Sequence, residues 1–134
     1  MPLLIGIFLA VVVAIFARVV GFDRDRAFYP TVLIVVGSFY VLFAVMAGGG
    51  PGLVPELIGF AVFAGLAVLG FRSSLWVVAA GLAAHGIFDF VRYNWAPGPG
   101  APEWWPGFCG GYDVAAAIAL AVILIQAGKK PAVA

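Results

Sequence analysis

His85 and Asp89 are the residues in this sequence whose types and spacing most directly suggest chemistry. They stand four positions apart in a long apolar segment, so a helix places both side chains on one face, which Arg92 extends. An imidazole beside a carboxylate can act as a general base or bind a metal ion. Ionisable groups inside a bilayer cost about 2.5–3.5 kcal/mol each, so their retention in such a segment predicts a functional site.

Three further polar residues are predicted to lie at similar depths. A helical rise of 1.5 Å per residue puts His85 roughly 15 Å into its span, with Asp89 one turn further on. Glu56 and Asp113 fall in the first turns of two other predicted spans, on the side toward which Asp89 lies. Tyr40 comes at a depth between His85 and Asp89. The sequence therefore predicts an intramembrane pocket that opens outward.

Each of these residues also has a purely structural interpretation. Glu56 and Asp113 can complement the positive N-terminal ends of their helices. Asp89 can pair with Arg92 three residues on, and His85 can bond to a tyrosine or a backbone carbonyl. The depth of His85 and its carboxylate neighbour favour a functional role for that residue.

The main functional hypothesis is a pocket that binds a cation or a small amphiphilic ligand. The metal-ligating set would be His85, Asp89, Glu56 and Asp113, a mixed nitrogen and oxygen set that suits zinc, manganese or iron. For an amphiphilic ligand, the binding residues would be Tyr40, Glu56, Asp113 and Arg92.

Two alternatives belong to other classes of protein. One is a membrane-embedded enzyme in which His85 and Asp89 are the catalytic residues, acting by acid–base chemistry on a lipid, an isoprenoid or a quinone. No serine or cysteine stands near His85 in a recognisable nucleophile pattern. The other is an accessory subunit that packs on a larger membrane complex or on a second copy of the chain.

Composition predicts the helices that must position these residues. The chain has 134 residues, of which 65% are hydrophobic and 10% charged, with a net charge of +1. Soluble domains carry about 25% charged residues, and disordered or nucleic-acid-binding chains carry more net charge, so those classes are excluded. A bilayer about 30 Å thick requires about 20 apolar residues per helix. The prediction is an all-α, polytopic transmembrane bundle forming one domain over residues 1–134, with helices at about 3–20, 28–47, 53–71, 75–93 and 112–128.

Basic residues predict the orientation of this bundle. All but Arg92 fall on one side of a five-helix arrangement: Arg18, Arg24, Arg26, Arg72, Lys129 and Lys130. The positive-inside rule then places the N-terminus outside and the C-terminus in the cytoplasm. The first span lacks a basic segment before it and a small-residue cleavage pattern, so we expect a retained helix. Abundant Ala, Gly and Val with few Lys indicate a bacterial inner membrane.

The predicted outer loop over residues 94–111 contains three tryptophans among prolines and glycines. Its aromatic residues are predicted to lie in the headgroup layer. The alternative is a lid over the pocket, in which the spacing Cys-x3-Asp brings Cys109 near Asp113. Cys109 is the single cysteine, so it cannot form an internal disulfide, and it is predicted to be a plain small residue. Small residues four apart predict close packing inside the bundle, as at Ala61 and Gly65, Ala80 and Ala84, and Ala117 and Ala121.

The segment 84–91 (AHGIFDFV), with Asn94, Cys109 and Asp113 after it, resembles a family of small bacterial integral membrane proteins of unknown function. In that family a late helix carries His-x3-Asp and the last helix begins near a Cys and an Asp. The resemblance covers about the last third of the chain and implies that His85, Asp89 and Asp113 belong together. Where further histidines tend to follow the Asp in the family, this chain has Arg92 and Tyr93.

Overall fold

The computed structural model describes residues 1–95 and 98–130, and these form an all-helical bundle. Within those residues there is no strand. The helices are α1 (Pro2–Val20), α2 (Phe28–Met46), α3 (Leu53–Arg72), α4 (Leu75–Trp95) and α5 (Trp105–Lys129), with short 3₁₀ turns η1 (Phe22–Arg24) and η2 (Gly50–Gly52). All five α-helices are long and apolar enough to cross a membrane. The predicted transmembrane helical bundle is therefore confirmed in its fold class.

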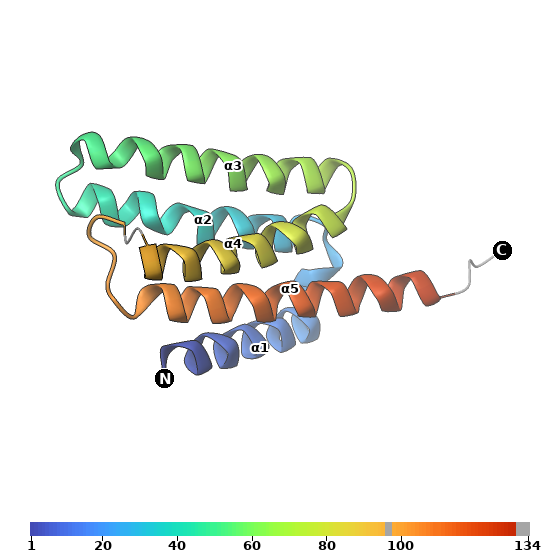
Figure 1. The fold of residues 1–134 in the computed structure, drawn as a ribbon. Coiled ribbons are helices and arrows are strands. Elements are labelled where there is room, and N and C mark those ends of the chain that lie inside the picture. The colour runs from blue at the N-terminus through green and yellow to red at the C-terminus, as the bar shows by residue number, and fades with distance from the viewer. Residues whose placement is uncertain (96–97, 131–134) are drawn as a thin grey trace.

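The helices pack side by side in an order that differs from their order along the chain (Figure 1). α5 lies between α1 and α4, while α3 packs against both α2 and α4. α1 and α2 follow one another in the sequence, yet α1 packs mainly on α5 and α2 packs mainly on α3. α5 is the longest helix, and its C-terminal end projects beyond the rest of the bundle (Figure 1). This arrangement makes the α4–α5 interface the centre of the molecule.

α5 begins at Trp105, whereas the sequence predicts a start at residue 112. The glycines and prolines of this region are typical of a loop, but Pro106 lies in the first turn, where a helix needs no proline N–H. Trp105 and Cys109 are consequently buried helix residues. Trp95 and Trp104 are exposed, as residues in a headgroup layer would be.

Glycines bring three of the helices into very close contact. A Cβ on Gly6 of α1 would overlap the carbonyl oxygen of Phe108, and one on Gly111 would lie 2.5 Å from the carbonyl oxygen of Leu3. Between α4 and α5, a Cβ on Gly86 would lie 3.2 Å from the carbonyl oxygen of Gly110. These backbones can approach so closely only because the glycines lack a side chain.

The small-residue pairs predicted to pack inside the bundle differ in burial. Ala117 is buried and Ala121 half-buried on α5, as expected for a packing pair. Ala61 and Gly65 on α3 are exposed, and so are Ala80 and Ala84 on α4. Four-residue spacing identifies a helix face, but it does not say which face the neighbouring helix covers.

Arg26 ties the connection between α1 and α2 to the end of α3. Its guanidinium donates to the carbonyl oxygens of Phe71 (3.0 Å) and Gly70 (3.4 Å). These are carbonyls of the last helical turn, which carries partial negative charge. The basic connections thus lie together at one end of the bundle, and the side of the membrane to which that end faces stays a prediction.

Candidate functional site

Four ionisable side chains meet in the middle of the α4–α5 interface. His85 lies at the midpoint of α4, and its Nδ1 is 2.6 Å from Oδ2 of Asp113 on α5 and 3.5 Å from Oδ2 of Asp89. The Sγ of Cys109 lies 3.6 Å from the same Asp113 oxygen. One ligand atom from each of the four residues lies within 4.8 Å of all the others. We call these four residues the α4–α5 cluster.

Every member of the α4–α5 cluster is removed from the surface. Asp89 and Asp113 are 0% exposed, His85 is 1% exposed and Cys109 is 2% exposed. Both Asp89 oxygens and Oδ1 of Asp113 have no hydrogen-bond partner among the residues described. A protonated His85 could balance only one of the two carboxylates. Buried charges are normally paired or bound to a metal, so the cluster has acceptor capacity that the protein leaves unused.

Close helix packing explains why these residues meet. Gly86 and Gly110 are the direct neighbours of His85 and Cys109, and their backbones nearly touch. That contact brings the side chains flanking it on each helix to the same level. The i to i+4 spacing then adds Asp89 on α4 and Asp113 on α5.

Cys109 is the member of the cluster that the sequence prediction left out. The predicted loop over residues 94–111 placed it outside the last helix, and no nucleophile pattern was expected beside His85. Because α5 starts at Trp105, Cys109 lies one helical turn before Asp113 and on the same face. The spacing Cys-x3-Asp, which matches His-x3-Asp on α4, was the signal for this position, and only the lid alternative used it to bring Cys109 near Asp113.

Glu56 belongs to a different pair. Its Oε1 accepts a hydrogen bond of 2.6 Å from Arg92, and the two residues form an ion pair between α3 and α4. Glu56 therefore lies apart from the other three predicted metal ligands, which meet at the α4–α5 interface. The alternative in which Arg92 pairs with Asp89 is wrong, because Arg92 pairs with Glu56 and Asp89 has no hydrogen-bond partner among the described residues.

Tyr40 lies beside the ion pair of Glu56 and Arg92. Its ring lies under the Arg92 guanidinium, with 4.8 Å from the carbon of that group to the ring centroid. Its hydroxyl is buried and unpartnered within the described part of the chain.

Asp113 is the ninth residue of α5, so it does not complement a helix N-terminus as one interpretation held. Glu56 does lie in the first turn of α3.

Aromatic rings enclose the imidazole of His85 on the side away from α5. Phe63 meets it edge to face at 4.6 Å between ring centroids, and Phe88 lies 5.9 Å away. Such an apolar surround excludes water and strengthens electrostatic interactions inside it. A cation held by this cluster would be bound in a dry, preformed site.

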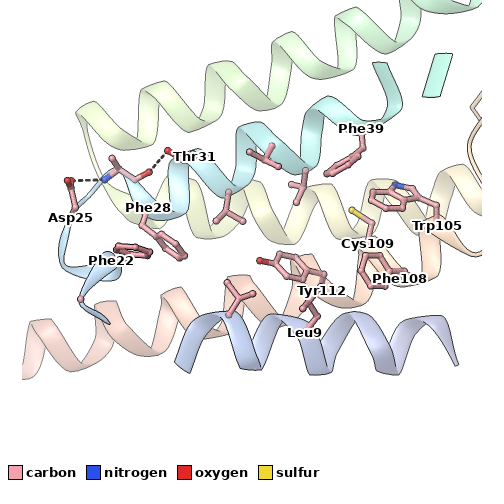
Figure 2. Close-up of a pocket in the computed structure, with 16 residues that line it drawn as sticks. Leu9, Phe22, Asp25, Phe28, Thr31, Phe39, Trp105, Phe108, Cys109 and Tyr112 are labelled. Carbon is pink, nitrogen blue, oxygen red and sulfur yellow. Dashed lines mark hydrogen bonds between the residues drawn. The ribbon is translucent and has the colours of Figure 1, made fainter. Parts of the chain in front are cut away.

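An apolar groove reaches the cluster from the side of the bundle (Figure 2). It has a volume of about 840 Å³ and is walled by α1, α2 and α5. Cys109 belongs both to the wall of this groove and to the α4–α5 cluster. The cluster therefore adjoins a surface that a membrane-spanning bundle would present to lipid.

Comparisons with known protein families, curated proteins and solved structures found no match to this chain. The resemblance to small bacterial membrane proteins accordingly stays a prediction from the segment around His85. The site has to be interpreted from its own residues.

Proposed function

We propose that this is a multi-pass membrane protein whose α4–α5 cluster binds a divalent transition-metal ion. The observation that carries the proposal is the convergence of His85, Asp89, Cys109 and Asp113 within 4.8 Å in a fully buried site. Two acidic side chains, a thiol and an imidazole give a cation four ligands of the usual kinds. The three unpartnered carboxylate oxygens support this function, because a bound cation would satisfy them.

Zinc is the metal that this ligand set favours. Zinc accepts thiolate, imidazole and carboxylate ligands together in tetrahedral sites, at bonds of about 2.0–2.3 Å. At those lengths the ligand atoms stand about 3.3–3.8 Å apart. Two separations in the cluster are close to this range: 3.5 Å from His85 Nδ1 to Asp89 Oδ2, and 3.6 Å from Cys109 Sγ to Asp113 Oδ2. The 2.6 Å contact between His85 and Asp113 would have to lengthen. Cys109 adds a soft ligand, which favours zinc or iron over manganese.

The test is metal content by mass spectrometry on protein purified in mild detergent without chelator. Native protein is compared with Asp113→Asn, His85→Ala and Glu56→Gln. Glu56→Gln is the matched control, because it makes the same change from carboxylate to amide at a buried position outside the cluster. Helical circular dichroism and a single elution peak verify that each variant is folded.

Near-stoichiometric zinc in the native protein and in Glu56→Gln, with loss in the two cluster variants, is the expected result. A second arm adds zinc to chelator-treated protein and follows thermal unfolding. A ligand at 100 times its Kd stabilises the folded state by about 2.7 kcal/mol. The proposal fails if no protein retains metal and added zinc, iron or manganese leaves the unfolding temperature unchanged.

A second candidate function is acid–base catalysis in the membrane, favoured by one specific contact. The Asp113 carboxylate holds the His85 imidazole at Nδ1, the geometry that orients a histidine general base. In this candidate Asp113 takes the orienting role that was predicted for Asp89. A metal-free native protein that still requires both residues for turnover of a lipid substrate would favour this candidate over the metal site.

A further inference from the structure

Tyr40 of α2 packs against the turn of α4 that carries Asp89. Its ring meets Phe88 edge to face at 5.9 Å between ring centroids, and the guanidinium carbon of Arg92 lies 4.8 Å from its centroid. Phe88 and Arg92 are four positions apart, so they lie on one face of α4, with Asp89 between them in the sequence. This packing places the Tyr40 hydroxyl beside the Asp89 carboxylate.

The hydroxyl of Tyr40 and the carboxylate of Asp89 are matched as donor and acceptor. Tyr40 is 3% exposed and Asp89 is 0% exposed. Within the described part of the chain, neither the hydroxyl nor either carboxylate oxygen forms a hydrogen bond. A tyrosine hydroxyl can donate one hydrogen bond, whereas an ionised carboxylate can only accept. Because buried polar groups are usually hydrogen-bonded, we expect the two groups to pair once Asp89 takes a fixed position.

A metal ion in the α4–α5 cluster would fix the position of Asp89. Its Oδ2 faces Nδ1 of His85 at 3.5 Å, so this oxygen is directed toward the cluster. A carboxylate that binds an ion through one oxygen keeps acceptor capacity on the other. Ligating carboxylates are commonly held by a hydrogen bond from outside the ligand set, and losing such a partner costs about 10- to 100-fold in metal affinity. Tyr40 is placed to supply this hydrogen bond.

We propose that Tyr40 is a positioning residue of the metal site and helps the site to select zinc over manganese. The inference rests on the proposed function, since it concerns how one of the four ligands is held. A hydrogen bond from Tyr40 to one Asp89 oxygen leaves the other oxygen alone to bind the ion. Binding through one oxygen suits four-coordinate zinc. Manganese favours octahedral sites built from oxygen, so it would gain from both Asp89 oxygens.

The test compares Tyr40→Phe with the native protein for zinc and for manganese separately. Each dissociation constant is measured by competition with a chromophoric chelator of known affinity, on chelator-treated protein in mild detergent. Tyr40→Phe keeps the ring and removes only the hydroxyl. We expect zinc binding to weaken about tenfold or more, and manganese binding to stay within about twofold of native. The preference for zinc then falls, which a general loss of stability would not cause.

Tyr29→Phe is the matched control. Tyr29 lies on the same helix, is 5% exposed, and its buried hydroxyl also has no partner among the described residues. It stands eleven positions before Tyr40, which is about 16 Å along a helix. This variant is expected to leave the affinities for both metals unchanged. Helical circular dichroism and thermal unfolding verify that the two variants are folded alike.

A double-variant cycle tests whether Tyr40 acts through Asp89. In an Asp89→Ala background three ligands remain, and the Tyr40 hydroxyl has lost the Asp89 acceptor. Adding Tyr40→Phe is then expected to change zinc affinity by less than about twofold.

The possible failures are distinct. An unchanged zinc affinity in Tyr40→Phe, an equal loss for zinc and manganese, or an equal loss with and without Asp89 would overturn the role of Tyr40 and leave the metal site intact. A native protein that binds neither metal would refute the metal site itself and this inference with it.

Discussion

His85 on α4 and Asp113 on α5 stand 28 positions apart in the sequence, yet their side chains meet at 2.6 Å. Asp89, one turn from His85 on the same helix, is further away, at 3.5 Å. The imidazole is therefore held more closely across the helix interface than along its own helix. The geometry of the site depends on how tightly α4 and α5 pack.

Helix contact at Gly86 is expected to control this geometry. In Gly86→Ala, the new Cβ would lie 2.9 Å from Cγ2 of Val114 and 3.2 Å from the Gly110 carbonyl oxygen, so the helices must separate. We expect destabilisation of about 1–3 kcal/mol together with weaker zinc binding. Gly65→Ala is the control, because its Cβ would meet nothing within 4 Å. That variant is expected to gain about 0.5–1 kcal/mol from reduced chain entropy, measured by thermal unfolding in detergent.

The ion pair between Glu56 and Arg92 is expected to matter most when only one partner is removed. Glu56 is 4% exposed and Arg92 13%, so Glu56→Leu leaves a largely buried guanidinium without its carboxylate. We expect a cost of about 3–5 kcal/mol for this single change and a smaller cost for the double variant Glu56→Leu/Arg92→Leu. A double-mutant cycle in unfolding free energy checks the prediction. Additive costs would show that the two residues act independently.

Cys109 is expected to react slowly with thiol reagents in the folded protein. It is 2% exposed, so a maleimide is expected to reach its sulfur only slowly, even from the groove whose wall includes Cys109. Unfolding in a denaturing detergent should expose it, and bound zinc should slow the reaction further, since the thiolate would be a ligand. Labelling followed by intact-mass measurement provides the test. Rapid labelling of the native chain would contradict the position of Cys109 in the cluster.

Arg26 is expected to stabilise the end of α3. Arg26→Gln loses the donors to the Gly70 and Phe71 carbonyl oxygens, and we expect a loss of about 0.5–1.5 kcal/mol in unfolding free energy. Arg24→Gln is the control, since it removes a neighbouring arginine whose side chain makes no hydrogen bond among the described residues. Equal effects of the two changes would indicate that charge alone is responsible.

The predicted orientation can be tested with introduced cysteines in a Cys109→Ala background. Ser73 lies in the turn before α4 and Tyr93 in its last turn, so these two exposed residues mark opposite ends of the helix. With the N-terminus outside, Tyr93→Cys should react with a membrane-impermeant maleimide on intact cells, and Ser73→Cys only after permeabilisation. The reverse pattern would mean that the basic end of the bundle faces outward.

Much of the fold was predictable because it depends on local properties of the chain. Five apolar segments of sufficient length specify five helices, since a membrane helix satisfies its own backbone hydrogen bonds. His85 and Asp89 share a face for a similarly local reason, the helical period. The start of α5 was less predictable, because Gly and Pro between residues 106 and 111 are typical of loops, while their actual roles are helix initiation and close packing.

Tertiary structure alone decided which residues complete the site. Glu56, Asp113 and Cys109 all lie on other helices or beyond a connection, so their distances from His85 depend on packing order and helix register. The packing at Gly86 and Gly110 brings Asp113 and Cys109 to His85, while α3 carries Glu56 to Arg92 instead. The sequence by itself determined a membrane bundle with a histidine and an aspartate on one helix face, because those features follow from hydrophobicity and helical period. Which carboxylates and thiol surround that histidine was decided by the approach of α5 to α4, because contacts between distant segments are set by close packing and not by spacing within one helix.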